Sequence, residues 1–149
     1  MTATAHAVIG TIIAAKIGNP ALAIPIALAS HIALDAIPHW DPATNRKEKK
    51  KQRLFIDSMV DVTLSFVVSY FLALFLFPTV NLSYVLLIVI FSQLFDWLTS
   101  PYYFFGINLP PFNWAYKFQK IFDNKLDKPW GIITQVSVIA LVLFLAILI

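Results

Sequence analysis

The sequence predicts an all-α, polytopic integral membrane protein. About five hydrophobic helices and one interfacial amphipathic helix would form a single membrane-embedded domain over residues 1–149. Two observations predict this class. Hydrophobic residues make up 59% of the chain and charged residues only 13%, whereas soluble domains carry roughly 25% charged residues. The apolar runs also approach the roughly 20 residues that a helix needs to cross a bilayer. The chain has no cysteine, which excludes disulfides and thiolate metal sites.

The first two hydrophobic segments are short. The first lies near Thr4–Ile17 and ends at Gly18-Asn19-Pro20, where Gly suits a helix C-cap and Pro can start a helix. The second runs from about Pro20 to Ile37, and Pro25 can kink it. Both are marginal for a span, so either an oblique crossing or a buried helical hairpin fits. Small residues on these segments would allow tight packing or a homo-oligomer: Ala3, Ala7, Gly10, Ala14, Ala23 and Ala27.

Three longer segments follow. Leu54–Phe77 is long enough to cross with tilt and ends at Pro78. Ser83–Thr99 is closed by Ser100-Pro101. Trp130–Ile149 contains no ionisable side chain, which makes it the clearest span in the sequence.

The segment 101–129 has a different character and is expected at the membrane interface. Pro110-Pro111 breaks the chain and Asn113 can cap the amphipathic helix predicted at Trp114–Leu126. One face carries Trp114, Phe118, Ile121 and Phe122, and the other carries Lys117, Lys120 and Asn124. Such a helix suits the headgroups of an anionic leaflet, with membrane lipids as partners. A loop helix packed on the bundle is the alternative.

The basic residues predict the orientation. Six lie in or beside the loop 42–53, four lie between Lys117 and Lys128, and only Lys16 lies elsewhere. The positive-inside rule then places both blocks and the amino terminus on the cytoplasmic side of a bacterial-type inner (plasma) membrane. Because hydrophobic segments flank the first block on both sides, we expect no nucleic-acid partner.

Several ionisable residues lie in or beside the apolar segments, where a charged side chain costs roughly 2.5–3.5 kcal/mol. His31, Asp35 and His39 recur at four-residue steps, as do Asp57 and Asp61, and such steps stack side chains on one helix face. The predicted topology brings four segments with such residues to one membrane depth. Imidazoles and carboxylates bind Zn²⁺ and similar divalent ions. The expected metal ligands are His6, His31, Asp35, His39, Asp61 and Asp96.

Two acidic residues also have local explanations. Asp57 can pair with Arg53, four residues earlier, and Asp41 before Pro42 can serve as a turn or cap residue. As functional residues, Asp57 and Asp61 are the candidate catalytic carboxylates, because an acid that does not bind the metal can act as general base.

The segment 29–41, Ala-Ser-His-Ile-Ala-Leu-Asp-Ala-Ile-Pro-His-Trp-Asp, with Thr-Ala-His-Ala-Val-Ile-Gly at 4–10, resembles the predicted membrane-bound metal-dependent hydrolases. That family is similar to zinc-dependent phospholipase C, an all-helical fold whose zinc ligands include His-x-x-x-Asp pairs. The resemblance covers mainly residues 2–41. It implies that His31 and Asp35 are paired ligands, His6 an amino-terminal ligand, and Asp61 and Asp96 inward-facing acids. Family members often carry a histidine before the last helix, where this chain has Phe122-Asp123-Asn124-Lys125.

These observations predict an inner-membrane metal-dependent hydrolase. Its substrate would be a phosphoester of a lipid or of a lipid-linked molecule, hydrolysed at the cytoplasmic interface by water that the metal activates. Two alternatives remain: a non-enzymatic membrane protein that binds or passes metal ions or protons, and a metal-stabilised scaffold.

Overall fold

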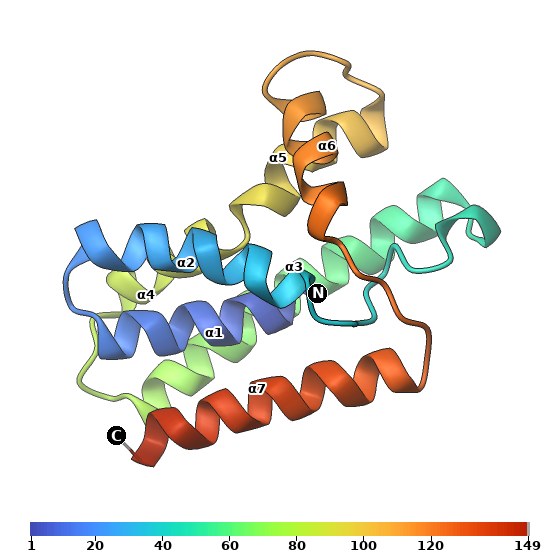
Figure 1. Ribbon diagram of the computed structural model, residues 1–149. Coiled ribbons are helices and arrows are strands. Elements are labelled where there is room, and N and C mark those ends of the chain that lie inside the picture. The colour runs from blue at the N-terminus through green and yellow to red at the C-terminus, as the bar shows by residue number, and fades with distance from the viewer. Residues whose placement is uncertain (149) are drawn as a thin grey trace.

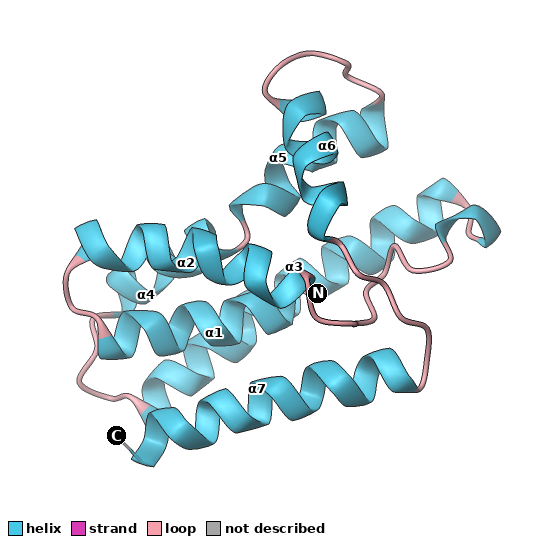
Figure 2. Ribbon diagram, in the orientation of Figure 1, coloured by secondary structure: helices cyan, strands magenta, loops and turns pink. Residues whose placement is uncertain are grey.

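The computed structural model describes residues 1–148, and this part of the chain is all-helical, with seven α-helices, one 3-10 helix and no strand (Figures 1 and 2). The predicted all-α class is therefore confirmed. The α-helices are α1 (Ala3–Lys16), α2 (Pro20–Asp35), α3 (Lys51–Leu76), α4 (Leu82–Ser92), α5 (Leu94–Phe105), α6 (Phe112–Phe122) and α7 (Trp130–Leu148); the 3-10 helix η1 is Arg46–Glu48.

Helix α1 lies at the centre of the bundle (Figure 1). It contacts α2, α3, α4 and α7, and eleven of its fourteen residues are buried. Because α1 is enclosed on all sides, a polar group that it carries is removed from solvent and needs a partner inside the protein.

The small residues of the first two helices are used for packing within the chain. All six of them are buried. At Gly10 a β-carbon would lie 2.7 Å from Ser92 Oγ and 3.3 Å from the Val89 Cα, so a larger residue would force α1 and α4 apart. This close approach holds the end of α4 beside α1, one turn from His6.

Two helices in residues 1–148, α3 and α7, are long and apolar enough to cross a membrane. A third span exists if α4 and α5, which are bent by 50° at their break, count as one. Fewer helices are therefore long enough to span than the five hydrophobic helices that were predicted, and the two short ones, α1 and α2, leave the buried hairpin as the alternative that fits. At 1.5 Å per residue, α1 and α2 are only about 21 and 24 Å long, less than the roughly 30 Å of a hydrocarbon core.

The predicted single helix over Ser83–Thr99 is also wrong, because the chain breaks at Gln93, between α4 and α5. The predicted amphipathic helix at Trp114–Leu126 is present as α6, which begins slightly earlier and ends at Phe122. Helices α5 and α6 pack against each other and project from the bundle (Figure 1). On α6, Trp114 is 65% exposed and Ile121 73%, so part of the apolar face does not pack on the rest of the protein.

Candidate metal centre

The three histidines of the chain all lie around the carboxylate of Asp35. Asp35 Oδ1 is 3.2 Å from Nε2 of His6 and 3.8 Å from Nε2 of His39, and Asp35 Oδ2 is 3.3 Å from Nε2 of His31. The amino group of Met1 also contacts Asp35 Oδ1. All four side chains are buried, and Asp96 Oδ1 lies 3.7 Å from Nε2 of His31. The structure therefore brings together five of the six predicted ligands, all but Asp61.

Helix geometry explains part of this arrangement. His31 and Asp35 lie one turn apart near the end of α2, and the chain turns back after Asp35 so that His39 approaches the same carboxylate. His6 comes from α1, and its ring stacks on that of His31 with centroids 3.9 Å apart. The packing of α1 against α2 thus places two imidazoles side by side.

Backbone carbonyls orient two of the imidazoles. Nδ1 of His31 donates to the Ser92 carbonyl at 2.8 Å, and Nδ1 of His39 donates to the Ile37 carbonyl at 2.8 Å. A carbonyl oxygen can only accept, so Nδ1 carries the proton and Nε2 keeps a lone pair in the neutral ring. Proteins commonly orient metal-binding histidines in this way.

Some of the buried nitrogens have no hydrogen-bond partner among the described residues. Both ring nitrogens of His6 and Nε2 of His39 are in this state. Nε2 of His6 is near Asp35 Oδ1, but the direction of approach does not make a hydrogen bond. An unsatisfied buried polar group costs about 1–3 kcal/mol. A bound cation would satisfy the lone pair of one His6 nitrogen and that of His39 Nε2, so the residues present fit a metal ion.

Two groups of side chains could hold such an ion. The helical group consists of His6, His31 and Asp96, from α1, α2 and α5; the loop group consists of His39, Asp41 and Asp123. Within each group one ligand atom from each residue lies within 4.8 Å of the others. Asp35 contacts histidines of both groups. Imidazole and carboxylate donors suit several divalent ions.

A side-chain amide marks the open side of the helical group. Nε2 of Gln119, on α6, donates to Asp96 Oδ1 and lies 3.4 Å from Asp35 Oδ2 and 3.3 Å from Nε2 of His31. Three acceptor atoms therefore converge on one donor group. Gln119 could not be predicted from the sequence, because nothing in the local pattern links α6 to α2.

Asp123 was also missed as a ligand candidate, although the segment 122–125 was noted as the place of a family histidine. Backbone pairing brings it to His39: the Leu126 N–H donates to the His39 carbonyl at 2.7 Å, and the His39 N–H donates to the Asn124 carbonyl at 3.0 Å. Gly131 lets the two segments meet, because a β-carbon there would lie 2.1 Å from the Leu126 carbonyl oxygen. Nε2 of His39 is 3.4 Å from Asp123 Oδ1.

A lysine stabilises the charges of the loop group. Lys125 Nζ lies 2.8 Å from Asp41 and 3.3 Å from Asp123. Burial alone would raise the pKa of Asp123, but the contact with His39 and the charge of Lys125 hold it below its usual value. Burial likewise acts to lower the pKa of Lys125, yet the two carboxylates raise it above its usual value. Asp123 is therefore ionised at neutral pH.

The two predicted catalytic carboxylates lie outside both groups. Asp61 accepts hydrogen bonds from the backbone N–H groups of Ala3 at 2.7 Å and Thr4 at 3.1 Å, so it caps the start of α1. Asp57 pairs with Arg53 at 2.8 Å, as the local explanation of its spacing predicts.

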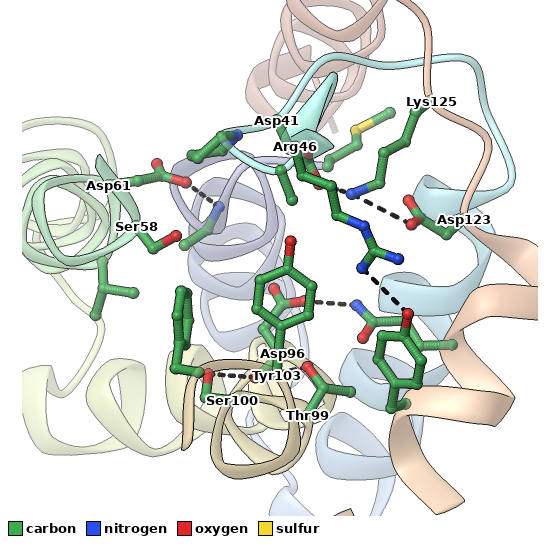
Figure 3. A pocket seen from close by; sticks show the side chains of 18 of the residues that line it. Asp41, Arg46, Ser58, Asp61, Asp96, Thr99, Ser100, Tyr103, Asp123 and Lys125 are labelled. Carbon is green, nitrogen blue, oxygen red and sulfur yellow. Dashed lines mark hydrogen bonds and ion pairs between the residues drawn. The ribbon is translucent and has the colours of Figure 1, made fainter. Parts of the chain in front are cut away.

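A cavity of about 780 Å³, here called the metal-side cavity, opens beside these groups (Figure 3). Its wall includes Asp96 of the helical group and Asp41 and Asp123 of the loop group. Asp61 and Arg46 also line it, with Arg46 pointing into the open space (Figure 3). A small polar molecule in the cavity would therefore meet carboxylates of both groups.

No protein-family model matches the sequence, and no curated protein or solved structure matches it either. Fold and site define an all-helical protein with apolar helices long enough to span a membrane and with buried His and Asp groups that could hold a metal ion.

Proposed function

We propose that the protein is an integral membrane hydrolase that depends on a divalent metal ion, with Zn²⁺ as the preferred candidate. The observation that carries the proposal is the convergence of every histidine in the chain on one buried carboxylate, Asp35. Carboxylates of α5 and of the loop after α6 lie beside them. The resemblance of residues 2–41 to membrane-bound metal-dependent hydrolases supports the same function.

The membrane placement rests on the outer surface of the bundle. In this proposal α3, α7 and the α4–α5 pair cross the bilayer, and α1 and α2 form a short hairpin packed among them. Large apolar side chains are exposed along α3 and α7, among them Phe71, Phe75, Leu141, Phe144 and Leu148. Exposed apolar surface of this extent is unfavourable in water and favourable in lipid. In this proposal the basic loop 42–53 and the metal-side cavity face the cytoplasm, as the positive-inside rule expects.

The substrate we propose is a phosphoester of a lipid or lipid-linked molecule, because the cavity would open at headgroup depth. His6, His31, Asp35 and Asp96 would hold the metal ion, which supplies Lewis acidity and activates water when bound. The proton acceptor needs to line the cavity without belonging to the helical group. Asp61 lines the cavity, but both its oxygens accept hydrogen bonds from the start of α1. Asp123 lines it as well and is ionised, so we assign this role to Asp123.

The proposal is tested by the metal content of detergent-purified protein, measured by elemental mass spectrometry. Wild type is expected to carry near-stoichiometric zinc, manganese or iron, and a folded His31→Ala variant is expected to lose it. Asp57→Asn is the matched control, because it alters a carboxylate that pairs only with the exposed Arg53. Lipid phosphoesters are then screened as substrates. Absence of metal from wild type, even after reconstitution, would overturn the proposal.

One observation favours a second function, a metal-binding protein without turnover, in which the His and Asp groups stabilise the fold or pass ions or protons. Asp57 and Asp61 are both engaged in structural contacts. An Asp123→Asn variant separates the two functions. Hydrolysis by wild type that is lost in the variant while metal remains bound supports the enzyme; metal binding without hydrolysis in either protein supports the second function.

A further inference from the structure

A second hollow lies next to the metal-side cavity, and its charged residues are all cationic, whereas those of the metal-side cavity are of both signs. Its volume is about 610 Å³, and we call it the basic hollow. Four cations line it, Arg46, Lys47, Lys49 and Lys51, and no carboxylate of the described residues does so. Arg46 and Tyr103 line both hollows. A ligand in the metal-side cavity would therefore meet Arg46 at the boundary with a strongly positive surface.

Arg46 is held in place by two aromatic side chains. Its guanidinium group lies 5.3 Å from the ring centroid of Tyr103 and 6.0 Å from that of Tyr116, and it donates to the Tyr116 hydroxyl at 3.1 Å. These contacts raise the pKa of Arg46 further above its usual range, the hydrogen bond to Tyr116 most of all. Cation–π contacts of this kind restrict a side chain that would otherwise be mobile.

The backbone of the loop is also fixed at the residue that precedes Arg46. Asn45 adopts the left-handed conformation with φ 57°, which Asn tolerates better than most residues. Its amide donates to Asp127 at 2.6 Å. Arg46 therefore starts from a backbone position that is tied to the segment before α7.

Where the two hollows meet, Arg46 and Tyr103 offer more hydrogen-bond donors than the neighbouring residues accept. A guanidinium group has five N–H donors, and Arg46 gives one hydrogen bond, with no carboxylate of the described residues within ion-pair distance. The Tyr103 hydroxyl is buried and makes no hydrogen bond of good geometry among the described residues, although it lies near enough to Arg46 to help raise the pKa of that side chain. A signal for membrane topology needs only positive charge in the loop. It explains neither the contacts of Arg46 with Tyr103 and Tyr116 nor the buried position of the Tyr103 hydroxyl.

We propose that Arg46 and the Tyr103 hydroxyl bind a phosphate group of the substrate, with the lysines of the basic hollow adding attraction. A planar guanidinium group matches phosphate with two parallel hydrogen bonds, which an ammonium group does not provide. The inference rests on the proposed function in one respect: the same substrate places its reacting group at the metal centre. The substrate then carries two phosphate groups, one at the metal and one at Arg46.

The experiment measures phosphate binding to the full protein in phosphatidylcholine nanodiscs. One arm titrates inorganic phosphate at low salt, and the other measures enrichment of phosphatidic acid around the protein in mixed nanodiscs. Arg46→Gln is expected to weaken binding about tenfold or more, because a hydrogen bond to a charged group contributes about 1.5–3 kcal/mol. Tyr103→Phe removes only the hydroxyl and is expected to weaken binding by a smaller factor.

The matched control is Arg53→Gln, which removes the same charge from an exposed arginine that pairs with Asp57. It is expected to bind phosphate as wild type does. Binding of inorganic phosphate would show that a phosphate group without a lipid is sufficient for recognition. Enrichment of phosphatidic acid without binding of inorganic phosphate would show that the site recognises a lipid headgroup. Equal loss in Arg46→Gln and Arg53→Gln, or no binding by wild type in either arm, would overturn the inference.

Failure of this inference can be told apart from failure of the proposed function. Metal content is measured on the same samples, and Arg46→Gln is expected to keep it unchanged. His31→Ala is expected to lose metal. The double variant His31→Ala/Arg46→Gln is expected to bind phosphate more weakly than His31→Ala alone. A protein without metal that binds phosphate through Arg46 would refute the hydrolase and leave the phosphate site standing.

Discussion

The helical group and the loop group contain similar donors but are built in different ways. His6, His31 and Asp96 project from helices whose positions are set by the packing of α1, α2 and α5. His39 and Asp123 lie on segments without regular secondary structure, more than 80 residues apart, and short backbone pairing joins those segments. Packed helices restrict side chains more than surface loops do. The comparison indicates that the helical group is a preformed site and that the loop group depends on the local pairing.

The largest expected effect tests whether metal binding is coupled to folding in both groups. A ligand at 1,000 times its dissociation constant stabilises the folded state by about 4 kcal/mol. Treating wild type with a chelator is therefore expected to lower its melting temperature clearly. Hydrogen exchange is expected to increase most around His39 and Asn124 and least in α1. A uniform increase across both regions would contradict the comparison.

The Asp35→Asn variant tests what the two groups share. Asp35 contacts all three histidines, so its loss is expected to weaken metal binding by about 100-fold or more, beyond the 10–100-fold typical of losing an outer-shell partner. Titration of the purified variant with Zn²⁺ against a chromogenic chelator measures this. Wild-type affinity in Asp35→Asn would place the centre elsewhere.

The Asp123→Asn variant tests whether the groups are separate. It removes one carboxylate charge from the loop group and leaves the helical group intact, so metal is expected to remain bound there. Any ion in the loop group is expected to bind at least about 100-fold more weakly, because Asp123 offers a direct ligand atom and even an outer-shell partner is worth about 10–100-fold. The absorption spectrum of Co²⁺-substituted protein distinguishes the two positions. Complete loss of metal would mean that both groups form one centre.

The smallest effects are expected at the two carboxylates outside both groups. Asp61→Asn weakens the cap of α1 and is expected to destabilise the fold by about 1 kcal/mol without changing the metal content. Asp57→Asn removes a pair with the exposed Arg53 and is expected to change stability by less than about 1 kcal/mol. Thermal unfolding followed by circular dichroism measures both. Loss of metal in Asp61→Asn would contradict this expectation and would mean that Asp61 is a metal ligand after all.

The same contrast explains how much could be predicted from the sequence. Four-residue spacing is a local pattern, so the juxtaposition of His31 with Asp35 could be predicted. The predicted topology also expected His6 and Asp96 near them, and the structure has both beside His31. Spacing does not determine which neighbour a carboxylate contacts. Asp61 lies four residues after Asp57, on the same helix face, but it caps α1 and does not contact the histidines. Asp123 and Gln119 depend on contacts between distant segments, which no local pattern encodes.

Hydropathy also has a limit that the fold makes visible. It predicted where apolar helices lie but not the break at Gln93, because residues on both sides of the break are similarly apolar. A run of apolar residues gives the composition of a helix and not its straightness. Hydropathy likewise marks α1 and α2 as apolar helices, but only their length in the structure shows that they are shorter than a span needs.

The break at Gln93 has a consequence for how the protein can evolve. At the end of α4 the carbonyl groups lack helical partners, and the Ser92 carbonyl accepts a hydrogen bond from Nδ1–H of His31 instead. The bend therefore decides which tautomer of a residue 61 positions earlier is present. Among descendants of this sequence, the interruption and the histidine are expected to be inherited together. A lineage that straightens the helix would lose the selective value of His31.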